Sequence, residues 1–171
     1  MSILSRIFRS APDPREELRP LWHSTVAEAR TPVYYTDGGV ADTVEGRFDL
    51  ITIMLAAVLV RMEGDADLAP KTALLTEFFV EDMDGQLREQ GVGDPVMGKH
   101  IGKLMSTLGG RIGAVRTGLR EDRGTLGDAL RRNVRFADDS KADALAAQVV
   151  ALFERLERSD AEALLRGEIA A

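Results

Sequence analysis

The chain has 171 residues, 44% hydrophobic and 29% charged, a length and balance typical of one globular domain with its own core. It contains no cysteine, which excludes disulfide bonds, thiolate metal sites and cysteine nucleophiles. The formal net charge is −6, so the chain as a whole is not expected to bind nucleic acid strongly.

Residues 1–13 are expected to form a mobile, basic N-terminal segment ahead of a single domain that spans 14–171. The segment is too short in apolar residues for a secretory signal. It has a small amphipathic pattern, formed by Ile3, Leu4, Arg6, Ile7, Phe8 and Arg9. A frayed terminus is the simpler interpretation, and contact with an anionic membrane surface is the alternative.

Two helices are predicted in the first third of the domain. The first covers residues 15–29, and a loop with Gly38–Gly39 as its turn follows it. Asp42 is predicted to cap the second helix, residues 43–62, which is apolar nearly all round. Its apolar run is about half of the ~20 residues that a membrane span needs. We therefore expect the central helix of a bundle.

The segment 78–103 has the most unusual content. Apolar residues recur there at helical spacing, with dense charge beside them, in the set Phe78, Phe79, Glu81, Asp82, Met83, Asp84, Leu87, Arg88 and Glu89. The helix is expected to stop at Gly91, turn through Gly93 and Asp94, and restart at Pro95. A glycine-bearing hinge with charge that packing does not require is the first place to look for function.

The helix predicted over 95–119 is rich in glycine, which weakens a helix by roughly 1 kcal/mol per residue relative to alanine. The pairs Gly98/Gly102 and Gly109/Gly113 are four residues apart and make small-residue faces. We expect another helix of the bundle to pack closely there, and the alternative is a flexible helix that adapts to a partner.

The remaining chain completes an all-α fold. Helices are predicted over 124–135 and 141–158, and Ser159 is expected to cap a last turn-rich segment. No segment shows the alternation of a strand. The predicted fold is a single-domain, irregular helical bundle of six to eight helices.

Charge is distributed unevenly along the chain. Residues 37–94 carry a net −9 from four basic and thirteen acidic side chains, and residues 95–135 a net +6 from nine basic and three acidic ones. Charge complementarity between packed helices is the preferred interpretation. The alternative is a basic patch that meets anionic lipid headgroups, ribosomal RNA or an acidic partner. Arg47 is predicted to bridge to Asp82 or Asp84, because a partly buried arginine needs a paired acid.

Nothing in the residues favours an enzyme, a metal site or a bound cofactor. Residues 93–100, GDPVMGKH, have the spacing of a phosphate-binding loop, but His100 replaces the serine or threonine and no buried strand precedes it. Neither histidine follows a glutamate at the spacing of a helical di-metal site. The residues point to binding, with no small-molecule substrate expected.

Four motifs resemble one known family: DTVEGRFDLI (42–51), DMDGQLREQGVGD (82–94), GKHIGKL (98–104) and ALRRNV (129–134). Their order and spacing are similar to those of the ubiquinol–cytochrome c chaperones, assembly factors of the cytochrome bc1 complex, in a form typical of bacteria. The resemblance covers roughly residues 21–151. It implies a non-enzymatic chaperone that binds newly made cytochrome b, in the cytoplasm or peripherally at the inner membrane.

The resemblance also implies candidate partners and sites. The mitochondrial relatives work with a small partner protein at the ribosome, but this chain's acidity argues against carrying ribosome contact over. The partner-facing or groove-shaping set it implies is Arg47, Asp49, Asp82, Asp84, Arg88, Gly91, Gly93, Asp94 and Lys99. A client groove is expected to use adaptable methionines, and the candidates for groove or core are Met54, Met62, Met83, Met97 and Met105.

One other class of function stays open from the sequence. The basic segment 95–135 is the whole case for a helical module that binds nucleic acid or the ribosome. It has no aromatic residue on which a base stacks. Salt-dependent binding to RNA would support this alternative, and selective binding of a protein client with little salt dependence would support the chaperone.

Overall fold

The computed structural model describes residues 13–89 and 94–170, and its regular elements are helical. The eight α-helices of these residues are α1 (Arg19–Glu28), α2 (Val33–Thr36), α3 (Val44–Glu63), α4 (Thr72–Glu89), α5 (Asp94–Arg116), α6 (Leu126–Asn133), α7 (Ala142–Arg158) and α8 (Ala161–Leu165). The predicted all-α bundle is confirmed. The expected mobile segment 1–13, apart from Asp13, and the hinge residues Gly91 and Gly93 lie outside the described residues.

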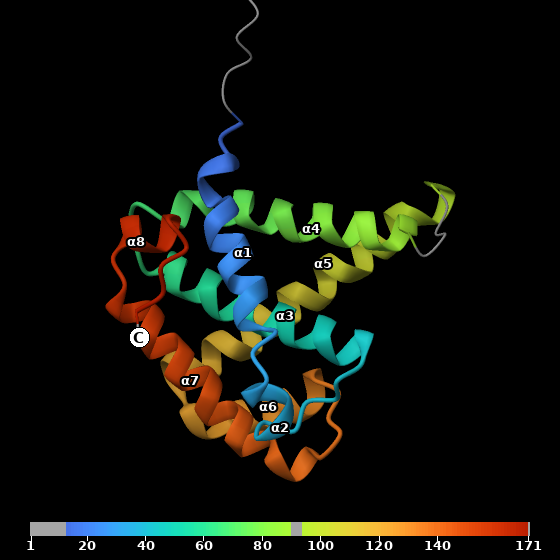
Figure 1. Ribbon diagram of the computed structural model, residues 1–171, viewed down its shortest axis with the longest axis vertical. Helices are drawn as coiled ribbons and strands as arrows, with labels where there is room; N and C mark the ends of the chain where they lie inside the picture. The colour runs from blue at the N-terminus through green and yellow to red at the C-terminus, as the bar shows by residue number, and fades with distance from the viewer. Residues whose placement is uncertain (1–12, 90–93, 171) are drawn as a thin grey trace, which may run out of the picture.

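α3 is the central helix, as predicted. Every residue from Leu50 to Met62 is buried, and the helix lies against α1, α5 and α7 (Figure 1). Each fully buried aliphatic side chain contributes about 1.5–3 kcal/mol relative to an exposed one, so this run is the main source of the core's stability. None of the helices in the described ranges is both long and apolar enough to span a membrane.

The start of α3 differs from the prediction by one residue. Thr43, not Asp42, is the N-cap: its Oγ1 accepts the backbone N–H of Gly46 at 3.1 Å. Thr43 has the extended backbone that directly precedes the first helical residue, so its side chain is the one within reach. The same shift occurs before α8, where Asp160, not Ser159, accepts the N–H of Ala163 at 2.7 Å.

The predicted loop after the first helix contains the short helix α2. Tyr34 in α2 is buried, and its hydroxyl donates to Glu28 Oε1 at 2.5 Å. Burial, and then this hydrogen bond, raises the pKa of Tyr34 above its ordinary value. Gly39 has a φ of +70°, so the predicted glycine turn is confirmed.

α4 and α5 lie against each other, and the C-terminal end of α4 and the start of α5 project to one side of the molecule (Figure 1). On α4, Phe78, Phe79 and Met83 are buried as the apolar stripe predicts. α5 ends at Arg116, earlier than predicted, because the chain continues through a π-helical turn, Thr117–Glu121. These two helices and α3 build the candidate site.

Candidate functional site

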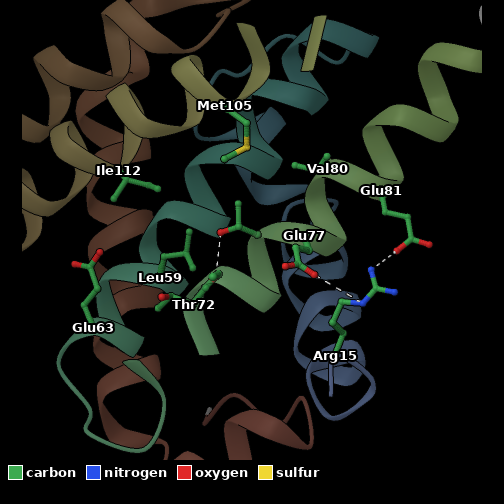
Figure 2. A pocket seen from close by; sticks show the side chains of 11 residues that line it. Arg15, Leu59, Glu63, Thr72, Glu77, Val80, Glu81, Met105 and Ile112 are labelled. Atoms are coloured by element: carbon green, nitrogen blue, oxygen red, sulfur yellow. Dashed lines mark hydrogen bonds and ion pairs between the residues drawn. The ribbon is translucent and has the colours of Figure 1, made fainter. Parts of the chain in front are cut away.

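An apolar groove of about 710 Å³ opens between α3, α4 and α5 (Figure 2). Its floor consists of Leu59 from α3, Val80 from α4, and Met105 and Ile112 from α5. The volume falls in the range of ordinary ligand pockets. Met105 is 40% exposed, unusual for a large hydrophobic residue in this domain. Of the five candidate methionines it alone is exposed in the part of the chain that the structure describes, and the other four belong to the core.

The rim of the apolar groove is acidic. Arg15 lies between Glu81, at 3.2 Å, and Glu77, at 3.9 Å (Figure 2). Glu63, on the opposite side, pairs with Arg116 at 2.7 Å. The charged residues that line the groove are therefore three carboxylates, of Glu63, Glu77 and Glu81, and one cation, Arg15.

Hydrogen bonds from these arginines fix the charges at the rim. The hydrogen bond with Asp13 raises the pKa of Arg15 and lowers that of Asp13 to about 2. The hydrogen bond with Glu63 raises the pKa of Arg116 in the same way. Because the pairs are largely exposed, solvent screens them, and their main effect is on the potential of the rim rather than on stability.

A bare glycine face adjoins the apolar groove. A Cβ added at Gly98, Gly102, Gly109 or Gly113 would meet no atom within 4 Å. Helical spacing places these four glycines on one side of α5, next to Met105 and Ile112. The predicted close packing of another helix of the bundle is therefore wrong. α5 packs on α3 through a different face, whose buried residues are Leu108, Arg111 and Val115.

A second pocket of about 470 Å³ lies at the other end of α3. Nine of its twelve lining residues come from the segments 42–51, 82–94 and 98–104, and Arg135 directly follows the fourth motif. We call it the motif pocket. Three of the motifs thus supply its walls, and the fourth ends beside it.

A buried polar network holds the motif pocket together. Asp49 is 2% exposed, and its Oδ1 accepts from Arg111 Nη2 at 2.5 Å. The other oxygen, Oδ2, accepts from Nη1 of Arg135 at 2.9 Å and from its backbone N–H at 3.1 Å. Arg111 also donates to Thr52 Oγ1 and, at 2.6 Å, to the carbonyl of Asn133. One carboxylate therefore ties α3 and α5 to the segment after α6.

The other predicted site residues do not come together. Arg47 is exposed and pairs with Asp42 at 2.6 Å, so the predicted bridge to Asp82 or Asp84 is wrong. Asp82 instead accepts the indole N–H of buried Trp22 at 2.7 Å. Asp84 pairs with Arg88 one turn along α4, at 2.8 Å. Both acids already have closer partners on α1 and α4, which is why neither is used by Arg47.

The rest of the predicted set adds little to the pocket. Lys99 is exposed on α5, Asp94 is its first residue, and Gly91 and Gly93 lie outside the described residues. Of the seven predicted residues that the structure describes, Asp49 alone lines the motif pocket. Sequence reasoning missed Lys103, Arg111 and Arg135. For Arg111 a signal existed, since an arginine at helical spacing between Leu108 and Val115 interrupts an apolar face and implies a buried acid.

The basic segment 95–135 is largely neutralised inside the molecule. Six of its seven arginines pair with acids, and five of them do so across long sequence separations, among them Arg116–Glu63, Arg120–Glu157 and Arg123–Glu154. Arg111, Arg131 and Arg135 complete the six. The predicted charge complementarity is confirmed, and the case for a nucleic-acid-binding face is correspondingly weaker.

Together, these observations define an all-helical protein with an open, largely apolar groove and an acidic rim. In the described ranges no group of three or more metal-ligating side chains is assembled. Residues 36–171 match the model of the ubiquinol–cytochrome c chaperone family, and the chain belongs to this family. Membership assigns it a chaperone's role in bc1 assembly in general terms.

A solved structure gives the same fold. The chain is similar to the protein in "Crystal structure of the Cbp3 homolog from Brucella abortus", with 30% identity and a TM-score of 0.79. The match covers 99% of this chain and 96% of that one. No curated protein matches the sequence.

Proposed function

We propose that this chaperone holds unassembled cytochrome b by packing one of its apolar helices into the apolar groove and against the glycine face of α5. The observation that carries the proposal is the glycine face, which nothing in the described chain covers, lying beside the exposed Met105. Four helix-weakening glycines on one face have no packing role among the residues that the structure describes, so a role with a partner accounts for them.

The chemistry of the groove suits a membrane helix as client. Small residues allow two helix backbones to approach closely, which is how helices pack in membrane proteins. The flexible thioether of Met105 fills irregular gaps against different side chains. Together they offer a surface that shields an apolar helix without requiring one particular sequence.

The acidic rim complements what flanks such a helix. Cytoplasmic loops next to membrane spans carry an excess of lysine and arginine. Glu63, Glu77 and Glu81 stand at the edge of the groove, where these cations would lie. The proposal places the protein in the cytoplasm at the membrane surface, with the client as its main partner. Ribosome contact is not included, because most arginines of the basic segment are already paired.

Complementation of a gene deletion in the host tests this function. The bc1 content is read from reduced-minus-oxidised spectra of haems b and c1, with other haem proteins as internal reference. The variants are Met105→Asp and its matched control Val33→Asp, because Val33 has nearly the same exposure, 38%, but lies on α2.

We expect the deletion to lose the bc1 signal, and the wild type and Val33→Asp to restore it. Met105→Asp should restore less than about a third of it at equal protein level, because a charge in the groove repels an apolar client. An unchanged spectrum in the deletion strain would contradict the function. Full restoration by Met105→Asp would contradict the groove while leaving the family role in place.

A further inference from the structure

The motif pocket carries positive charge that the acids lining it within the described residues do not neutralise. Its lining contains the cations Lys103, Arg111 and Arg135 and the anions Glu45 and Asp49, with His100 in addition. Asp49 serves as the acid for both arginines. Lys103 has no ion pair in the described part of the chain. A surplus of one positive charge therefore remains around this pocket.

The two arginines of the pocket keep N–H groups that no acceptor in the described chain uses. Arg111 is 6% exposed and its guanidinium is held by three different oxygens, yet its Nε is buried with no acceptor in the described chain. The Arg135 guanidinium, largely exposed, uses only Nη1 on Asp49, which leaves its other N–H groups for a second acceptor. The buried, fixed Arg111 and the exposed Arg135 therefore form one defined site rather than scattered surface charge.

Apolar side chains make most of the rest of the pocket, together with the polar residues Gln86 and Thr107. Phe48, Met83 and Leu104 line it, and Val44 at its edge is 67% exposed. The phenyl ring of Phe48 lies 5.7 Å from the guanidinium carbon of Arg111, so apolar and charged surfaces adjoin. The ligand that fits has one negative charge next to apolar groups.

We propose that the motif pocket binds a polypeptide segment that places one carboxylate side chain toward Lys103 and Arg135 and apolar side chains on Phe48 and Leu104. A phosphate or nucleic-acid polyanion fits less well, because the surplus is a single charge and Glu45 stands in the lining. The site is separate from the apolar groove, since Lys103 and Arg111 lie on another side of α5 than Met105 and Ile112.

A matched pair of peptides tests the site on the full-length, ¹⁵N-labelled chain. One peptide is a capped, leucine-rich helix with a single central glutamate, and its twin has glutamine there. We expect the glutamate peptide to shift the amide signals of residues 44–49 and 100–104 and to bind about tenfold more tightly than its twin. Lys103→Gln should weaken it about two- to fivefold, and Lys99→Gln, an exposed lysine one turn away outside the lining, should leave it unchanged.

Each alternative outcome overturns the proposal. Equal affinity for the two peptides would show that the pocket does not recognise the carboxylate. Equal weakening by Lys99→Gln and Lys103→Gln would show that the peptide responds to the overall positive potential of α5 and not to a defined site. If Lys103→Gln loses binding to phosphatidylglycerol vesicles but keeps the glutamate peptide, the pocket recognises lipid. Met105→Asp should leave intact the shifts that the glutamate peptide causes at residues 44–49 and 100–104, because these segments line the motif pocket and not the apolar groove. Failure here and failure of the apolar groove are therefore distinguishable. Arg135→Gln repeats the test with a second exposed side chain.

Discussion

α3 and α5 have similar lengths and pack against each other, yet only α3 has a long stretch that the described chain encloses on every side. α3 is buried from Leu50 to Met62 on every side. α5 is buried along Leu108, Arg111 and Val115, while its glycine face is bare and Met105 is exposed. The sequence of α3 is explained by the core. The sequence of α5 is explained only in part by the core, and the remainder is the surface that a client or partner would complete.

The largest expected effect comes from the contact that joins the two helices. Asp49→Ala should lower the free energy of unfolding by about 3–5 kcal/mol, because it leaves the buried Arg111 without its acid. Urea unfolding followed by circular dichroism measures this. Asp84→Ala, which removes an exposed pair on α4, serves as the control and should cost less than about 1 kcal/mol. Similar values for both variants would contradict the buried network.

A smaller loss of stability is expected at Asp82, whose carboxylate accepts the indole N–H of Trp22. Asp82→Ala should lower the free energy of unfolding by about 1–3 kcal/mol, because the indole N–H loses its acceptor in a buried position. A double-mutant cycle with Trp22→Phe checks the cause. If Asp82→Ala costs the same in the Trp22→Phe background, the hydrogen bond is not responsible.

The glycines give the sharpest contrast between enclosed and bare surface. Gly102→Ala and Gly109→Ala should each raise the free energy of unfolding by about 0.5–1 kcal/mol, because alanine favours the helix and its methyl group meets nothing. Gly118→Ala should lower it, because its Cβ would lie 2.9 Å from the Cβ of Leu126. Thermal unfolding of the three variants measures both signs. Destabilisation by Gly102→Ala or Gly109→Ala would mean that this face is covered.

The smallest effect is the contribution of Asp65 to acid stability. The backbone N–H of Asp67, and then the Arg61 guanidinium, lower the pKa of the Asp65 carboxyl in the folded state. A carboxyl with a lowered folded pKa stabilises the protein above its unfolded pKa of about 4, and this contribution disappears as the pH falls through the folded value. Asp65→Asn should therefore flatten the loss of stability between about pH 5 and 3. An unchanged slope in urea unfolding across that range would contradict the assignment.

The features that the sequence predicts correctly are those that the local pattern of apolar residues determines. The apolar run of α3 and the stripe of Phe78, Phe79 and Met83 require burial whatever their neighbours are. The cap of α3 was placed one residue early because Asp42 and Thr43 are both capping residues, and only the backbone geometry separates them.

Ion pairs and hydrogen bonds between residues far apart in the sequence cannot be predicted from local pattern. The sequence predicts a bridge from Arg47 to Asp82 or Asp84, but which acid meets which partner depends on how α1, α3 and α4 are oriented. The glycines of α5 read as a packing face in the sequence, and spacing does not say whether the partner belongs to the same chain. The Arg111–Asp49 pair is therefore a result of the structure.

The most direct test of the central claim is site-specific photo-crosslinking in the host during synthesis of the bc1 subunits. A photoreactive residue replaces Met105 beside the glycine face or, as control, Val33, which is equally exposed on α2. The account predicts a crosslink from position 105 to newly made cytochrome b and none from position 33. Crosslinks from both positions alike, or from neither while the motif pocket captures the subunit, would contradict the claim that the bare face of α5 holds the client.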